Sequence, residues 1–449
     1  MKGSEQPESN PCISRPGTKR HPPQRDVRIL FLQGPPSSFA RELGAELASR
    51  GAFVRRINLC FGDWVYWHDR RSISYRGSLN DWEGFLEDFV RRHQITDIIY
   101  FADRFPYHRT AQRVARRLEI NAIAFEYGYI RPDWIVVEPF GQSGYSHFPT
   151  DPVRIAALAS ELPHPEFKRR FEHSFFGESL GDVVHHLGNY FCWFFYPRFQ
   201  RDRIYNPLLE YVSYPLRFWR AFRARGRVDR LCQRLYAART PIFIVPLQMQ
   251  NDYQIRANSP YTDQREFLNQ VLCSFAEHAP EDSALIIKPH PLDNGLENWS
   301  RFVRNSTQHL GLDHRVHYLD GGNLDAMAAK ASGMITINST SGMTSLRLGC
   351  PVKAMGLAVY DIDGLTHSGS LDTFWNEPTA PDVQGLENFL KVMAARCHVR
   401  GDFYSKVGRK AAGRAMADRI MSESPFFDVF LDKAPRLERA HQLGIHIDV

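Results

Sequence analysis

The order of apolar and polar stretches along the chain predicts a first region of alternating strands and helices. Short apolar runs, typical of buried strands, alternate there with segments whose apolar residues recur at helical spacing. Strands are expected at 27–33, 53–59, 97–102 and 122–125, and helices around 39–47 and over 81–94 and 108–119. This alternation is typical of βαβ units built around a parallel sheet.

The same alternation returns in the second half of the chain. Strands are expected at 241–247, 284–288, 316–319, 334–337 and 351–355, with helices over 263–278, 324–331 and 341–348. Two closing helices, near 383–397 and over 406–421, are expected to cross back onto the first domain. The pattern therefore predicts two α/β domains.

The stretch between these regions follows a different pattern. From about 150 to 235 the chain is rich in aromatic residues and arginine, as in NYFCWFFYPRFQRDR and YPLRFWRAFRARGR. We interpret it as a helical, aromatic and basic insertion. Aromatic side chains with interleaved arginines suit a membrane surface or an acceptor-docking element, while helices that simply pack between two domains are the alternative.

Length and composition fit this division of the chain. At 449 residues and 43% hydrophobic residues, the chain is too long for one ordinary domain and apolar enough to bury two cores. We expect a disordered polar tail at 1–25, because it lacks the apolar segment of a signal peptide. The predicted domains are an N-terminal α/β acceptor-side domain (26–149), the insertion (150–235), a C-terminal α/β nucleotide-sugar domain (236–400) and the returning helices (401–449).

Charge and cysteine usage narrow the class of partner. The chain has 56 lysines and arginines against 50 acidic residues, a mild excess that suits anionic ligands or an anionic membrane face. Nucleic-acid binding is not expected, because neither an aromatic ribonucleoprotein motif nor zinc-finger spacing is present. Seven scattered cysteines without a CxxC pair indicate a reducing compartment, and no apolar window is long enough for a membrane span.

The first candidate for chemistry is the sequence KPHP, which directly follows a predicted strand of the second domain. It contains Lys288, His290 and Pro291 at the carboxyl end of that strand, where ligands bind in open α/β sheets. The imidazole can donate to a phosphate or act as an acid or base, and the lysine adds positive charge. A histidine that merely caps a turn is the alternative.

A second candidate is the stretch NSTSG, where a predicted strand runs into small polar residues and then a helix. It comprises Asn338, Ser339, Thr340, Ser341 and Gly342. Free backbone N–H groups and the helix dipole bind phosphate, and the hydroxyl groups add further donors. An ordinary helix N-cap explains the same residues without a ligand.

Carboxylates follow strands in both predicted domains. Gln248 and Asp252 form a QxxxD motif past a strand of the second, and a carboxylate there can attack or stabilise an oxocarbenium-like centre. In the first, Glu126 follows one strand, and Asp103 and His108 follow another. Glu126 is the candidate acid/base from the opposite wall of the cleft, with a capping or salt-bridged role as its alternative.

Several activities are disfavoured because their motifs are missing. The chain has no GxxxxGK[ST], HExxH or GxSxG motif, which argues against a P-loop triphosphatase, a zincin and an α/β-hydrolase. Nothing in the pattern requires a metal ion or a tightly bound cofactor. We therefore expect a metal-independent reaction with an activated substrate.

Taken together, these motifs resemble the capsule polysaccharide biosynthesis and export family of the KpsS/LipB type. The similar stretches run from about Val27 to Leu371 and include FLQGPPSSFARELGAELASRG, FEYGYIRPDW, PLQMQNDYQIRANSP, KPHPLDNG and NSTSGMTSLRLGCPVKAMG. Each motif alone is common, whereas QxxxD, KPHP and NSTSG in this order are specific. One departure is that Phe125-Glu126-Tyr127-Gly128 holds a single acid where the resemblance implies two adjacent ones.

The resemblance implies a GT-B architecture, with two Rossmann-like domains facing a central cleft. It also implies transfer of 3-deoxy-manno-octulosonic acid (Kdo) from CMP-Kdo to a phosphatidylglycerol-type lipid, which starts the poly-Kdo linker of a capsule. On this reading the protein is cytoplasmic and peripheral to the inner membrane, beside capsule assembly and export proteins. His290 and Pro291 would face the CMP phosphate, Ser339, Thr340 and Ser341 would hold phosphate or cytidine, Asp252 would be the nucleophile of a retaining reaction, and Glu126 would deprotonate the acceptor.

Two other functions remain open at this point. A non-catalytic export accessory would tolerate changes at Asp252 and Glu126 and would bind no nucleotide. A nucleotide-sugar epimerase of the same fold would act on the donor and need no lipid acceptor.

Overall fold

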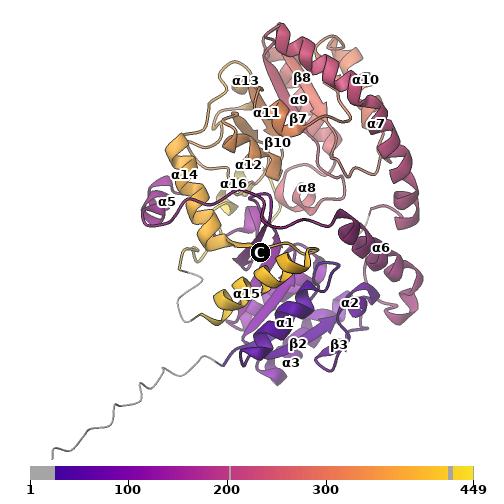
Figure 1. The fold of residues 1–449 in the computed structure, drawn as a ribbon, viewed down its shortest axis with the longest axis vertical. Helices are drawn as coiled ribbons and strands as arrows, with labels where there is room; N and C mark the ends of the chain where they lie inside the picture. Colours follow the sequence, from indigo (N-terminus) through magenta and orange to yellow (C-terminus); the bar gives the residue numbers. More distant parts are fainter. Residues whose placement is uncertain (1–25, 202–203, 423–427, 448–449) are drawn as a thin grey trace, which may run out of the picture.

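A computed structural model describes residues 26–201, 204–422 and 428–447 (Figure 1). The predicted N-terminal tail at 1–25 lies outside these residues. Within the described ranges the strands form one sheet of seven strands and one of five. The two sheets lie in separate halves of the molecule, with the helices α6 (Phe175–Phe191) and α7 (Pro207–Ala237) along one side (Figure 1).

The first sheet is parallel except at one edge. Its strand order is β12-β6-β5-β4-β1-β2-β3, and the β5–β6 and β6–β12 pairs are antiparallel. The bounds are β1 Arg28–Phe31, β2 Phe53–Asn58, β3 Ser72–Ser74, β4 Asp97–Phe101, β5 Asn121–Tyr127, β6 Trp134–Pro139 and β12 His398–Arg400.

Helices cover both faces of this sheet because successive strand residues point to opposite sides. On one face, Ile29 and Phe31 of β1 pack with α1 and α15; on the other, Leu30 packs with α3 and α4. Ser78 begins α3 by accepting from the backbone N–H of Asp81 at 3.3 Å, as an N-cap residue does. The helices are α1 Phe39–Ser49, α2 Phe61–Tyr66, α3 Leu79–His93, α4 Pro106–Arg117 and α15 Lys406–Met421.

The second sheet is parallel throughout, with the order β11-β10-β7-β8-β9. Phe243 and Val245 of β7 pack with α9 and α10, whereas Ile242 and Ile244 face a second cluster that includes α11, α12 and α14. Its elements are β7 Ile242–Pro246, α8 Tyr253–Asn258, α9 Gln264–His278, β8 Ala284–Lys288, α10 Trp299–Leu310, β9 Val316–Tyr318, α11 Leu324–Ala328, β10 Gly333–Thr336, α12 Thr340–Arg347, β11 Val352–Ala354, α13 Leu371–Phe374 and α14 Val383–Val392.

The end of the chain ties the two halves together. β12 joins the edge of the first sheet, and α15 then packs against α1, as Figure 1 shows. Arg436, just before α16 (Leu437–Gln442), donates to the carbonyl oxygens of Phe148 at 2.8 Å and Val359 at 2.6 Å. The returning strand and helix therefore fix the first half relative to the second.

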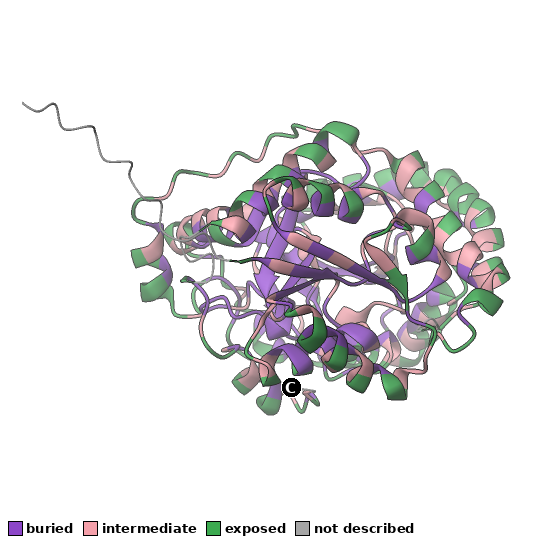
Figure 2. Ribbon diagram, turned by 90° about the horizontal axis from the view of Figure 1, so that it is seen from below, coloured by how far each residue is buried: buried purple, intermediate pink, exposed green. Residues whose placement is uncertain are grey.

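The insertion is helical. It contains α5 (Pro152–Ala159), α6 (Phe175–Phe191), a 3-10 turn at Trp193–Phe195 and the long α7 (Pro207–Ala237). The strands are largely buried, while α6 and α7 have many exposed positions (Figure 2). In the described part of the chain no helix is both long and apolar enough to span a bilayer.

The structure confirms the predicted α/β class with two facing sheets and a helical insertion. Three strands escaped the pattern: β3 and β12 are only three residues long, and β6 follows β5 after a short turn. The residue numbers chosen as domain boundaries stay predictions, and β12 begins at His398, inside the range assigned to the second domain.

Candidate functional site

A pocket of about 1080 Å³ lies between the two sheets and the insertion. The first sheet contributes Tyr127, at the end of β5, while the loops after β7 and β8 contribute Asn251 and His290. Helices α6 and α7 close the remaining side. The carboxyl ends of β5, β7 and β8 thus meet at one place, where open α/β sheets bind ligands.

Glu126, the second-last residue of β5, has a carboxyl group with an unusual pKa. Burial, together with the charges of Asp103 and Asp252, raises this pKa to about 8, against an opposing effect of Arg131. Asp103 follows β4 and Asp252 follows β7, so carboxylates from both halves approach Glu126. At neutral pH the Glu126 carboxyl is therefore mostly protonated.

Asp252 lies at the N-terminus of α8. Its Oδ1 accepts from the backbone N–H of Gln254 at 2.9 Å. Burial raises the pKa of Asp252, although hydrogen bonds from Gln254 and Gln248 oppose the rise. The carboxylate is thus held in place by an N-cap contact and by Gln248, close enough to Glu126 for its charge to act there.

Two buried amides join the QxxxD and NSTSG motifs. Nε2 of Gln248 donates to Oδ1 of Asn338 at 3.1 Å, and Nδ2 of Asn338 donates to the carbonyl oxygen of Gln254 at 2.8 Å. These contacts use the amides to fix the loop that carries Asp252. Their predicted contact with the nucleotide sugar stays a prediction.

The start of α12 carries the remaining NSTSG residues. Oγ of Ser339 accepts from the backbone N–H of Ser341 at 3.2 Å, so Ser339 is an N-cap. A Cβ atom on Gly342 would lie 2.2 Å from the hydroxyl of Tyr360, which explains the glycine by packing. Thr340 and Ser341 remain partly exposed at the helix start, and their phosphate-binding role stays a prediction.

His290 lines the pocket and is held in its neutral form. Its Nδ1 accepts from the backbone N–H of Leu292 at 3.1 Å, so the neutral ring carries its proton on Nε2. Burial, with the positive charges of Arg131, Lys288 and Arg217, lowers its pKa to about 4. The ring is therefore suited to donate one hydrogen bond and poorly suited to accept a proton at pH 7.

The structure separates His290 from the two residues predicted to act beside it. Nζ of Lys288 donates to the carbonyl oxygen of Gly321 at 2.6 Å, next to the Arg217–Asp320 ion pair at 2.8 Å. Pro291 is exposed. Within the KPHP motif, then, His290 alone reaches the pocket among the residues that the structure describes as lining it.

The pocket contains ionisable residues that sequence reasoning missed. His173 bonds Asp402 through Nδ1 at 2.6 Å and Glu178 through Nε2 at 2.8 Å. Burial lowers the pKa of His173, but the two carboxylates outweigh it and the net pKa is raised. Arg131 lies over the ring of Tyr127, with 5.1 Å between its Cζ and the ring centroid. These residues come from distant segments, so only Arg131, within the quoted FEYGYIRPDW stretch, had a sequence signal.

Asp103 and His108 have structural contacts. Oδ2 of Asp103 accepts from Nε of Arg104 at 3.1 Å and from the backbone N–H of Gln142 at 2.9 Å. His108 is buried and bonds the carbonyl oxygen of Ala102 at 2.7 Å, and burial lowers its pKa to about 3. Asp103 therefore acts on the site through its charge, and His108 belongs to the core.

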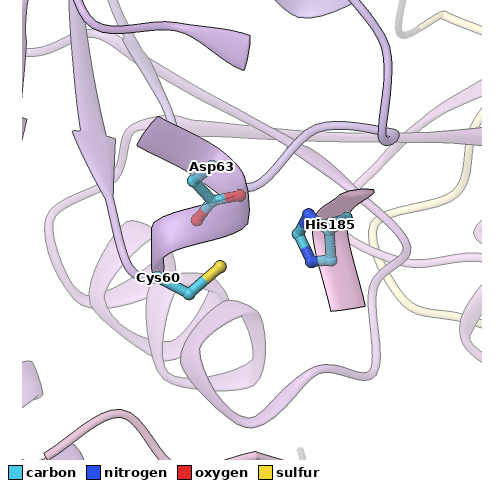
Figure 3. Close-up of side chains that lie close together, drawn as sticks. All are labelled: Cys60, Asp63 and His185. Carbon is cyan, nitrogen blue, oxygen red and sulfur yellow. The ribbon is translucent and has the colours of Figure 1, made fainter. Parts of the chain in front are cut away.

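One group of possible metal ligands occurs among the described residues, away from the sequence motifs (Figure 3). Ligand atoms of Cys60, Asp63 and His185 lie within 4.8 Å of one another. The Asp63 carboxylate already pairs with the buried guanidinium of Arg56 at 3.2 Å. Because this cation supplies the opposite charge, the cluster does not require a metal ion.

Two facing α/β units, with residues of both lining one pocket, define a GT-B-like protein. Comparison with known proteins adds the family. A sequence model described as capsule polysaccharide biosynthesis protein matches residues 96–404, and the chain belongs to this family.

Its relatives fit this assignment. The capsule polysaccharide export protein KpsS of Escherichia coli is 31% identical over 84% of this chain and 97% of its own length. The capsule polysaccharide modification protein LipB of Neisseria meningitidis serogroup B is 32% identical over 84% and 92%. A solved structure, Thermosulfurimonas dismutans KpsC, beta Kdo 2,7 transferase, is 13% identical with a TM-score of 0.42, covering 88% of this chain and 98% of that one.

Proposed function

We propose that this protein is a glycosyltransferase that moves Kdo from CMP-Kdo to a phosphatidylglycerol-type lipid, starting the poly-Kdo linker of a capsule. The observation that carries the proposal is the electrostatic coupling of Glu126 and Asp252, from the two halves, directly beside the pocket that Tyr127, Asn251 and His290 line. A protonated carboxyl, a held carboxylate and a neutral N–H donor are the groups that sugar transfer from a nucleotide donor needs.

In the first step, His290 donates from Nε2 to the phosphate of CMP-Kdo, and the start of α12 supplies further N–H groups. Asp252 attacks the anomeric carbon, the bond from that carbon to the phosphate oxygen breaks, and CMP leaves with the electron pair. The phosphate is a stable anion and needs no proton to leave. The product is a glycosyl ester on Asp252, and no metal ion takes part.

In the second step, the acceptor hydroxyl attacks the same carbon and Asp252 leaves as a carboxylate. Glu126 takes the hydroxyl proton. Esterification of Asp252 removes one of the charges that raise the pKa of Glu126, so Glu126 releases its own proton to solvent more readily and its carboxylate can then accept the proton of the hydroxyl. Two displacements at one carbon retain its configuration.

The proposed location is the cytoplasmic face of the inner membrane, beside the capsule assembly and export proteins. The relatives named for capsule export and modification support the pathway, and a lipid acceptor requires the enzyme to reach a bilayer. The apolar wall that α6 and α7 give the pocket is consistent with a lipid acceptor.

The direct test is incubation of the purified protein with CMP-Kdo, generated in place, and a fluorescent phosphatidylglycerol analogue. Mass spectrometry should find a product one Kdo heavier with wild type, and none with Asp252→Asn. Absence of both product and CMP binding would favour the non-catalytic accessory. Conversion of the donor sugar without any acceptor would favour the epimerase.

A further inference from the structure

We infer that the outer face of α7 docks on an anionic phospholipid bilayer and that the pocket opens toward this bilayer. The inference deepens the proposed function and, for the lipid route into the pocket, rests on it. We call the outward residues Leu209, Val212, Leu216 and Trp219 the α7 stripe.

The α7 stripe is an unpartnered apolar surface. Its residues follow one another at intervals of three or four, which places them on one side of the helix. Val212 is 77% exposed and Trp219 53% exposed. The opposite side of α7 holds the buried residues Arg217 and Val228. Contiguous exposed apolar surface of this kind marks an interaction site.

The charge of α7 points to an anionic partner. Beyond the stripe, α7 carries the exposed arginines Arg220, Arg223, Arg225, Arg227, Arg230 and Arg234, of which Arg220, Arg227, Arg230 and Arg234 also border an open cavity against the second half. Asp229 is the single acidic residue in this half of the helix. Arg223 lies 4.8 Å from the ring centroid of Trp219, so the cation and the aromatic ring share one surface. Aromatic rings at the acyl boundary with guanidinium groups among phosphates are typical of interfacial helices.

Helix α6 and the turn after it widen this apolar surface. The hydroxyl of Tyr211 in α7 donates to Asp182 in α6 at 2.8 Å, which holds the two helices together. Ring contacts continue the surface to α2, since Phe61 stacks with both Trp64 and Phe195 at 5.6 Å. The exposed apolar residues of this second group are Phe175, Phe176, Leu180, Phe191, Trp193, Phe194 and Phe195.

The pocket reaches the second exposed group at Phe175, whereas the four residues of the α7 stripe do not line it. Phe175 of α6 and Phe218 of α7 are both exposed, and both also line the pocket that reaches His290. A lipid can therefore keep its acyl chains in the bilayer or against these helices while its headgroup enters between the sheets. A protein partner would explain the apolar stripe, but it would not need exposed apolar side chains such as Phe175 and Phe218 at the pocket.

The test is flotation of the full chain with phosphatidylcholine vesicles, with and without phosphatidylglycerol. We expect the protein to bind the anionic vesicles and the binding to weaken with salt. In Val212→Ser/Leu216→Ser/Trp219→Ser, vesicle binding should fall by roughly tenfold or more. A second variant, Arg220→Gln/Arg223→Gln/Arg227→Gln, should lose the part of vesicle binding that depends on salt. The matched control Val153→Ser/Val383→Ser/Val407→Ser removes equally exposed valines from α5, α14 and α15 and should float like wild type.

Three results would overturn the inference: no flotation of wild type, equal flotation of the stripe variant, or a wild-type dimer that the stripe variant converts to monomer without any vesicle binding. Transfer of Kdo to a soluble short-chain phosphatidylglycerol separates the two proposals. The stripe variant should keep this activity. If the protein floats with vesicles but transfers Kdo neither to vesicle phosphatidylglycerol nor to the soluble form, the proposed function is contradicted and the docking surface is still supported.

Discussion

The two halves of the molecule bring different chemistry to the pocket between them. The first sheet places Glu126 next to the pocket residue Tyr127, and burial with neighbouring carboxylates raises the pKa of Glu126 to about 8. The second contributes His290, whose pKa burial and neighbouring cations lower to about 4. Near neutral pH both groups are uncharged and carry a proton, because burial and neighbouring like charges disfavour the charged form of each.

This difference assigns separate tasks to the two walls. Asp252 belongs to the second half but raises the pKa of Glu126, so it couples the walls. The Glu126 side is suited to proton transfer with an acceptor, and the His290 side is suited to hold an anionic leaving group. Changes on the first wall should therefore alter turnover, and changes on the second should alter nucleotide binding.

The largest effect is expected for Asp252→Asn. The amide cannot form the glycosyl ester, so transfer should fall by at least ~10³-fold, while CMP binding changes little. Calorimetric titration with CMP and the lipid-product assay measure the two quantities. Parallel loss of both would mean that Asp252 mainly holds the nucleotide.

Glu126→Gln should lower transfer by roughly 10²- to 10³-fold, because the second displacement loses its base. The free energy of unfolding should not fall. Because the pKa of Glu126 is about 8 in the folded state and near 4.5 in the unfolded state, its contribution to stability is complete below pH 4.5 and is lost as the pH rises through 8. Urea unfolding above pH 8 should find the glutamine variant at least as stable as wild type, and a less stable variant would contradict the burial argument.

A coupling between the walls is expected in the titration of Glu126. Removal of the charge at position 252 should lower the pKa of Glu126, since Asp252 is one cause of the rise. Carbon-13 NMR of labelled glutamate carboxyls in wild type and Asp252→Asn reads this shift. An unchanged pKa of Glu126 would mean that the two carboxyl groups do not interact electrostatically.

His290→Ala should weaken CMP binding by roughly 10- to 100-fold, the effect of removing one hydrogen bond to a charged group. Lys288→Met, at the end of β8, is the matched comparison from the same KPHP motif. Because Nζ of Lys288 bonds Gly321, its loss should lower stability and leave CMP affinity of the folded protein within a few-fold. The reverse pattern would restore Lys288 as the nucleotide-binding residue.

The smallest effect is expected at Gly342→Ala. The added methyl group would lie 2.2 Å from the hydroxyl of Tyr360, so either the ring or the start of α12 must shift. We expect a loss of about 1–3 kcal/mol in the free energy of unfolding, measured in urea. An unchanged stability would mean that the contact is loose.

The sequence predicted most strands of the two sheets from their apolar residues, including β9 and β11, which are only three residues long. β3 and β12 are equally short and less apolar, and β12 pairs with β6 across more than 250 residues of chain. The family resemblance was confirmed, as was the α/β class. These parts depend on local patterns and ordered motifs.

The site was less accessible to sequence reasoning. The sequence placed His290 at a strand end, but it could not show that Lys288, two residues earlier, turns toward Gly321. The His173–Asp402–Glu178 group was missed because its members come together only after the chain crosses back. The roles of Gln248 and Asn338 likewise depend on a contact between two loops.

The proposed glycosyl ester on Asp252 can be tested by intact-protein mass spectrometry. Glu126→Gln would be incubated with CMP-Kdo without acceptor and then mapped by peptide. We expect a protein one Kdo heavier, with the sugar on Asp252, because the first displacement needs no base. Release of CMP without any adduct, or an adduct on another residue, would contradict it.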